Sequence, residues 1–299
     1  MRNMRIFKHE RIHLAAFVAF GAFAIAQQST PPPVRQEFDV ASVKPNKSSE
    51  LAASANIPLG PGTVFPEVGG HFSATNIPLM GYISFGWKLQ GNQGQALVSQ
   101  MPAWVLSDRF DIQAEVAGHP GKDDMRMMMR ALLADRFKLA IRSENRQVNV
   151  FGLVLGKAGK TGKWFQAHLD GSCSTNPPPS DTEAAGEFPA LCGGVLPVPH
   201  PPGYMNKFGA RNVSLEFIAN QITALGHLDR PVLDQTGLNG NWDFALQWVP
   251  DVPGADPEAL AAGPSFLEAL AEQMGLKLVS QKAPAEFLVL DHVEHPSDN

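Results

Sequence analysis

The sequence predicts an α+β protein with two similar β-α-β-α-β-β units, joined by a proline-rich loop that a disulfide holds in place. Three observations support this prediction. Short apolar strands alternate with amphipathic helices, short motifs recur at a nearly constant spacing, and a stretch without periodicity separates the two halves. The 299 residues, 44% of them hydrophobic, are enough for a buried core.

We expect five segments along the chain, and their boundaries follow from shifts in composition. Prolines gather in the leader and in the inter-unit loop, where regular structure is not expected. The segments are a signal peptide at 1–26, a flexible leader at 27–36, a first α+β unit at 37–165, a Pro/Gly-rich inter-unit loop at 166–203 and a second α+β unit at 204–299.

The first segment has the pattern of a cleavable export signal. A basic start precedes an almost wholly apolar stretch from Leu14 to Ala26, which ends in the small-x-small triplet Ala24-Ile25-Ala26. The stretch is shorter than the roughly 20 residues that a membrane span needs. We therefore expect cleavage after Ala26, with an uncleaved anchor as the alternative, and a periplasmic or fully extracellular mature protein.

Removal of the signal makes the chain more acidic. The segment holds four basic residues and one acidic residue, so the mature chain has 20 basic and 28 acidic residues and a net charge of −8. A protein of this charge, with no basic stripe in its sequence, is a poor nucleic-acid binder. Nucleic acid is therefore not an expected partner.

In the first unit, Phe38 to Val43 predicts the first strand, and a Gly-, Pro- and Ser-rich loop follows from Pro45 to about Gly70. Residues 110–116 alternate between apolar and polar side chains, which is typical of a half-buried strand. Asp123 and Asp124 favour the N-terminus of a helix. The apolar face of that helix is made of Met125, Met128, Met129, Leu132 and Phe137.

The second unit carries clearer helix boundaries. Ser214 is expected to cap a helix that Gly226 ends. A capping box formed by Ser265 and Glu268 begins another helix, and a glycine at 275 ends it. Between the two helices, residues 242–248 alternate as a strand.

Four short motifs of the first unit recur in the second at offsets of 134 to 139 residues, in the same order. We interpret them as an internal duplication; the alternative is two similar α+β patterns that arose by chance. The matched pairs are Phe72–Asn76 with Phe208–Asn212, Phe110–Gln113 with Phe244–Gln247, Lys138–Leu139 with Lys277–Leu278, and Leu153–Leu155 with Leu288–Leu290.

The chain has only two cysteines, Cys173 and Cys192, and both lie in the inter-unit loop. Export makes a disulfide between them chemically permitted, and closing a loop of this size adds roughly 3 kcal/mol of stability in the chain-entropy model. Two free thiols or a redox pair are the alternatives, which the absence of a Cys-x-x-Cys spacing disfavours.

Catalytic motifs are hard to find. The C-terminal His292, Glu294 and His295 are the best metal-ligand candidates. On a strand, however, His292 and Glu294 share one face while His295 points to the other, so their convergence is poor. Surface histidines are the alternative, and we predict no catalytic residue and no cofactor.

Two further patterns admit a functional and a structural reading. The triplet Asp-Arg-Phe occurs at 108–110 and again at 135–137. It indicates either an anion-binding pair of arginines or, as we prefer, ion pairs at element ends with each phenylalanine in the core. The methionines of 125–129 are expected in the core, with a soft binding face as the alternative.

A set of short motifs runs along the chain: Phe38–Asn46, Ser107–Ile112, Leu132–Leu139, Val232–Leu238, Met274–Leu278 and Leu290–Glu294 with Pro296–Ser297. Together they resemble a family of secreted proteins, expanded in soil Acidobacteria and catalogued as domain of unknown function 3738. The resemblance spans nearly the whole mature chain. Some members carry the domain beside a membrane metallopeptidase-type sensor or a thioredoxin-like domain, which implies a binding or sensing role in the cell envelope and no particular catalytic residue.

These observations lead to two main hypotheses of function and leave a purely structural envelope protein without a specific ligand as a third option. The first is a non-catalytic binding or sensing module of the cell envelope, whose partner is a protein, a peptide or a glycan; free sheet edges suit peptide addition. The second is a metal-dependent hydrolase that uses His292, Glu294 and His295. We prefer the first, because the sequence shows no converging acids, bases or nucleophiles.

Overall fold

The computed structural model describes residues 36–48, 52–157, 159–175, 187–200, 203–251 and 261–296. The expected signal peptide and nearly all of the leader lie outside these residues. The chain divides into two compact units, Met1–Val34 and Arg35–Asn299. The second unit contains both helices and mostly antiparallel sheets, so the predicted α+β class is confirmed.

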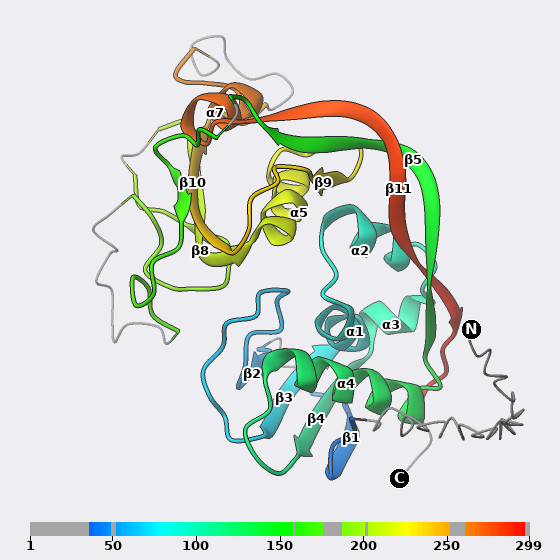
Figure 1. Cartoon of the computed structure of the whole chain (residues 1–299). Helices are drawn as coiled ribbons and strands as arrows, with labels where there is room; N and C mark the ends of the chain where they lie inside the picture. The colour runs from blue at the N-terminus through cyan, green and yellow to red at the C-terminus, as the bar shows by residue number, and fades with distance from the viewer. Residues whose placement is uncertain are drawn as a thin grey trace, which may run out of the picture. The chain divides into compact units, whose positions relative to one another are not determined.

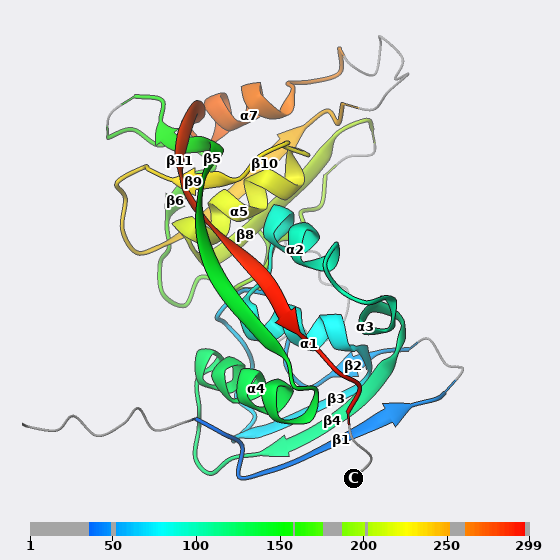
Figure 2. The same ribbon diagram turned by 90° about the vertical axis from the view of Figure 1, so that its right-hand side faces the viewer.

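The first half of this second unit is a four-stranded antiparallel sheet with helices on it (Figure 2). Alternation buries Phe110, Ile112 and Ala114 of the central strand β4. Helices α1 and α4 contribute Phe85 and Met129 to the same core. The elements are β1 (Val40–Asn46), β2 (Ser54–Ala55), β3 (His71–Pro78), α1 (Leu79–Trp87), α2 (Gly91–Val98), α3 (Ala103–Ser107), β4 (Arg109–Glu115) and α4 (Lys122–Arg136).

The second half has its own four-stranded sheet and its own core, which includes Phe244 and Leu276. The predicted cap is confirmed, since Ser214 Oγ accepts a hydrogen bond from the Phe217 N–H. The capping box of Ser265 and Glu268 is confirmed as well. The elements are β6 (Phe165–Ala167), β7 (Leu196–Pro197), β8 (Asn206–Ser214), α5 (Leu215–Leu225), β10 (Asn241–Trp248) and α7 (Phe266–Gln273).

A third sheet joins the two halves. Strand β5 (Ala140–Leu155) pairs antiparallel with β11 (Leu276–His292) along its whole length, and β9 (Val232–Asp234) adds in parallel to β5. Figure 1 shows the two long ribbons side by side. We expected each unit to end in two consecutive strands. Instead, β5 and β11 are each one continuous strand, because no two-residue turn signal interrupts either segment.

The two four-stranded sheets have the same strand order. The first runs β1-β4-β3-β2 and the second β6-β10-β8-β7, so each strand of one has a counterpart in the other. Asn76 and Asn212 both adopt left-handed backbone at a register shift, with φ of 59° and 55°. Each N–H donates to an aspartate of the central strand, Asp111 or Asp243, at 2.8 and 3.0 Å. A common origin of the halves stays a prediction.

The predicted disulfide is confirmed: Cys173 and Cys192 are bonded, with 5.4 Å between their Cα atoms. Such a bond is compatible with an extracellular location. Within the part of the chain that the structure describes, no helix is long and apolar enough to cross a membrane.

Candidate binding site

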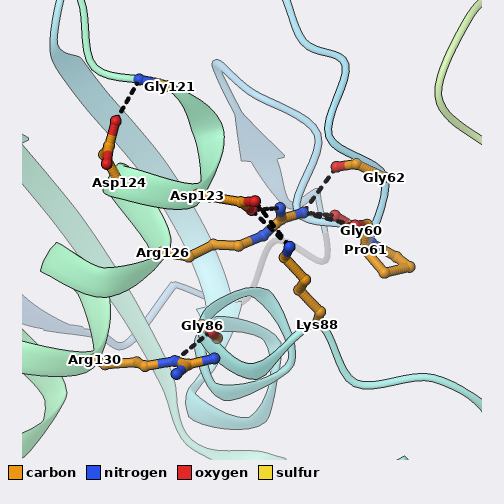
Figure 3. Close-up of polar contacts among 10 residues, drawn as sticks. All are labelled: Gly60, Pro61, Gly62, Gly86, Lys88, Gly121, Asp123, Asp124, Arg126 and Arg130. Atoms are coloured by element: carbon orange, nitrogen blue, oxygen red, sulfur yellow. Dashed lines mark hydrogen bonds and ion pairs between the residues drawn. The ribbon is translucent and has the colours of Figure 1, made fainter. Parts of the chain in front are cut away.

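A fully buried arginine fixes a loop of the first half. Arg126 lies on the apolar face of α4, and its side chain is only 2% exposed. Its Nη2 atom donates to the carbonyl oxygens of Gly60, Pro61 and Gly62 at 2.8 to 2.9 Å (Figure 3). Burial lowers the pKa of Arg126, but a guanidinium remains protonated in proteins. Residues 58–66, here called the anchored loop, are thereby held on α4.

One carboxylate balances two cations at this anchor. Asp123 accepts a hydrogen bond from Arg126 Nη1 at 2.5 Å and lies 2.8 Å from the Lys88 ammonium. Burial alone would raise the pKa of Asp123, but the hydrogen bonds from Lys88 and Arg126 outweigh it and lower that pKa. Figure 3 shows Lys88 and Arg126 converging on Asp123 from different elements. Lys88 itself caps α1 in left-handed backbone.

The anchored loop touches the segment that carries the second cysteine. A Cβ atom on Gly62 would lie 1.6 Å from the Gly193 carbonyl oxygen, and one on Gly193 would lie 2.6 Å from Val64 Cβ. Gly193 also has φ of 82°, which favours glycine. Residues 191–196, here called the disulfide segment, therefore pack backbone to backbone against the anchored loop.

A pocket of about 470 Å³ lies between these two segments, here called the loop–disulfide pocket. Prolines, glycines and aliphatic side chains make most of its wall, with Phe217 of α5 contributed by the second half. Its volume falls in the range of small-molecule sites, roughly 300–1,000 Å³. Because Arg126 and the disulfide fix its two sides, the pocket is formed without a ligand.

Lys122 is the one charged side chain among the described residues that line this pocket. It is the first residue of α4 and is only 3% exposed. No hydrogen bond joins its ammonium to any residue that the structure describes. Burial, and then the nearby Arg126, lower the pKa of Lys122 to about 7. A lysine that is almost wholly buried in a mostly apolar wall marks a candidate site.

A second pocket, of about 250 Å³, adjoins the first and shares Pro61, Gly62 and Phe217 with it. Its wall is polar, with Trp87 beside Asn212, Asn220, Asn241 and Glu216. We call it the Trp87 pocket. Arg130, whose guanidinium lies 5.0 Å from the Trp87 ring centroid and donates to Gly86, holds that ring (Figure 3 shows the Gly86 bond).

The predicted metal candidates do not converge. His292 Nε2 lies 2.7 Å from Glu294 Oε1. His295 stacks on Trp104, with ring centroids 3.9 Å apart, and contacts Asp108 instead. Among the described residues, no group of three or more His, Cys, Asp or Glu side chains could hold a metal ion. The role of these residues stays a prediction.

A buried histidine–aspartate pair in the second half resembles part of a catalytic triad but lacks its geometry. His168 Nδ1 lies 2.7 Å from Asp243 Oδ1, and the Ser172 hydroxyl lies 3.5 Å from the same Nδ1. A triad needs the serine and the carboxylate on opposite ring nitrogens. Asp243 also accepts from Asn212, so we assign the pair to holding β8 and β10 at their register shift.

The repeated Asp-Arg-Phe triplets agree with the structural interpretation in their phenylalanines and in one of the two expected ion pairs. Phe110 and Phe137 are buried and meet edge to face at 5.0 Å. Arg136 pairs with Asp135, but Arg109 donates to the carbonyl oxygen of Asn76 rather than to Asp108. The methionines Met125, Met128 and Met129 lie in the core as predicted, whereas Met127 is 49% exposed.

Residues 80–293 match the family described as protein of unknown function (DUF3738). The chain belongs to this family. This is the family that the sequence motifs resemble. The matched residues include all of these motifs except Phe38–Asn46 and the part of the C-terminal motif beyond residue 293. No curated protein and no solved structure matches the chain.

The residues that build the pockets of this DUF3738 chain were missed by sequence reasoning. The anchored loop offers Arg126 backbone carbonyls, which every residue has, so no motif marks it. A signal does exist, because Arg126 interrupts the apolar face formed by Met125 and Met129. A charge in such a position needs buried partners.

Proposed function

We propose that this DUF3738 protein is an exported, non-catalytic binding or sensing module of the cell envelope, whose ligand occupies the loop–disulfide pocket. One observation carries the proposal: a preformed apolar pocket of about 470 Å³ holds a single buried lysine in its wall. A few polar groups in an otherwise apolar cavity are typical of ligand sites. Export is supported by the signal-like N-terminus and by the disulfide.

Fixed walls support binding rather than chemistry. Arg126 ties one wall to α4 and the Cys173–Cys192 bond ties the other. Preorganised walls reduce the entropy lost when a ligand binds. Lys122 can orient a ligand by charge, and no second acid or base is found with it among the described lining residues. A binding role uses all of these features.

The experiment uses the neutral apolar probe N-phenyl-1-naphthylamine, whose fluorescence rises in apolar surroundings. Gly194 lines the pocket, and a side chain there would meet open space. Gly194→Leu should fill the pocket and abolish saturable probe binding. The matched control is Gly203→Leu, since a Cβ there also meets nothing within 4 Å but the residue does not line the pocket. Equal probe binding by both variants would refute the proposal.

A second candidate function, glycan binding, is favoured by the Trp87 pocket. Aromatic rings and side-chain amides are the groups that bind the faces and hydroxyls of sugars. Asn220→Leu should then abolish heat release when N-acetylglucosamine oligomers are titrated, while probe binding in the loop–disulfide pocket persists. No heat release from the unaltered protein would exclude these glycans as ligands.

A further inference from the structure

The charges around Lys122 are unbalanced. Arg126 and Lys88 are both cations, and the one carboxylate between them, Asp123, is bonded to both. The neighbouring Asp124 accepts hydrogen bonds from the Gly121 N–H and from Gln36. A positive charge on Lys122 is therefore left without a partner among the described residues.

The position of Lys122 adds to this imbalance. It is the first residue of α4, a helix of 15 residues, and the N-terminus of a helix carries a partial positive charge. Lysine is disfavoured there and an anion is favoured. Because the residue is only 3% exposed, water compensates for the charge less than it does at the surface.

Most of the remaining wall is apolar, with Thr175 and Gln221 as its other polar side chains. Val64, Val195 and Leu196 line the pocket together with three prolines of the anchored loop. A ligand that fits such a wall needs an apolar body, and a ligand that satisfies Lys122 needs one anionic group. We propose that the loop–disulfide pocket binds a monocarboxylate amphiphile, with the carboxylate paired to Lys122 and the alkyl chain along the apolar wall.

This inference rests on the proposed function, and its test separates the two. Dodecanoate and dodecanol, both below the concentrations at which they aggregate, compete with N-phenyl-1-naphthylamine for the pocket at about pH 6.5. The two ligands share a chain and differ in the headgroup. The unaltered protein should bind dodecanoate roughly 10-fold to 100-fold more tightly than dodecanol, which is the usual effect of one charge-assisted hydrogen bond.

Variants assign the difference to one side chain. Lys122→Met keeps an unbranched side chain that is one heavy atom shorter and removes the charge, so it should lose the preference for dodecanoate and keep its affinity for dodecanol. Lys277→Met, which removes an exposed lysine of β11, should bind both ligands as the unaltered protein does. If Lys122→Met does not fold, the relative affinity of the unaltered protein for dodecanoate and dodecanol still tests the carboxylate inference.

A proton balance gives a second readout. At about pH 8 a carboxylate that pairs with Lys122 should draw a proton onto it, and titration calorimetry in buffers of different ionisation enthalpy measures that uptake. The other charged groups that face Lys122 are Lys88, Asp123 and Arg126. Dodecanol should cause no uptake.

The outcomes differ for the two claims. Equal affinity for both ligands in the unaltered protein, or an unchanged preference in Lys122→Met, would overturn the carboxylate inference while the binding function stands. Failure of both ligands to displace the probe would also overturn the carboxylate inference, whereas the binding function falls only if Gly194→Leu and Gly203→Leu bind the probe equally.

Discussion

The backbone of Gly62 meets the backbone of Gly193 so closely that a Cβ atom on Gly62 would lie 1.6 Å from the Gly193 carbonyl oxygen. This contact joins the anchored loop to the disulfide segment, although 131 residues separate the two glycines in the sequence. It closes one side of the loop–disulfide pocket. Glycine is therefore needed at 62 for space rather than for backbone conformation.

Gly62→Ala should separate the two segments. Overpacking of this kind costs about 1–3 kcal/mol, so the free energy of unfolding in urea should fall by that amount and the affinity for N-phenyl-1-naphthylamine should fall with it. Gly60→Ala is the control, because a Cβ there meets nothing within 4 Å. If the two variants unfold at the same urea concentration, the close contact is not present in solution.

Arg126→Met should be among the most destabilising substitutions in the chain. It leaves three carbonyl oxygens of the anchored loop without their donor, and each buried acceptor that is left unsatisfied costs about 1–3 kcal/mol. Arg142→Met is the control, because that arginine is 52% exposed and pairs with Asp291 and Glu144. Its loss should cost at most about 1 kcal/mol. Similar unfolding free energies for both variants would contradict the anchor.

Lys122 should make stability rise with pH. The pKa of Lys122 is about 7 in the folded protein and about 10.4 in an unfolded chain. Between these values the unfolded chain binds a proton that the folded chain lacks, so protonation favours unfolding and stability increases as the pH rises. The slope is at most about 1.4 kcal/mol per pH unit, reduced by any water in the pocket.

The measurement compares the unaltered protein with Lys122→Met in urea from about pH 6 to about pH 10. The difference in unfolding free energy should change little below about pH 7 and should then shift in favour of the unaltered protein as the pH rises toward 10. Lys277→Met should show no such change relative to the unaltered protein. A difference for Lys122→Met that is constant with pH would mean that Lys122 titrates as an ordinary surface lysine.

Removal of the disulfide should affect stability and binding together. The double substitution Cys173→Ser, Cys192→Ser opens a loop with a sequence separation of 19, which costs about 3 kcal/mol in the chain-entropy model. Since Cys192 lines the pocket, probe affinity should fall in the variant under conditions where it is still folded. Unchanged affinity would show that the disulfide does not hold the pocket wall.

The metal-dependent hydrolase is tested by metal analysis of the purified protein. If the protein is a binding module, we expect no stoichiometric zinc or manganese, and no rise in melting temperature when either is added. His292 and His295 contact different carboxylates, Glu294 and Asp108, which gives the physical reason. One equivalent of bound metal, lost in His292→Ala, would restore the hydrolase hypothesis.

Local signals predicted the elements well, because their physical causes are local. Ser214 and Ser265 cap helices through residues three positions away, and Met125 and Met129 share a face at helical spacing. The disulfide was predictable because only two cysteines are present. These features need no knowledge of the distant chain.

The pairing of β5 with β11 and the pockets could not be predicted, because they depend on distant segments. Leu155 pairs with Leu276, and nothing near either residue specifies that partner. Lys122 belongs to a helix that was predicted, but its burial depends on loops whose composition indicated only irregular structure. His292 and His295 were candidates because histidine is a common metal ligand. The pocket, in contrast, is built largely from glycine, proline and backbone atoms, which no motif marks.

The central claim is that the loop–disulfide pocket is a ligand site, and a crystal structure of the protein with N-phenyl-1-naphthylamine tests it most directly. We expect the probe between the anchored loop and the disulfide segment, in contact with Phe217 and Lys122. A saturably bound probe found elsewhere on the protein, with this pocket filled by the chain itself, would contradict the claim.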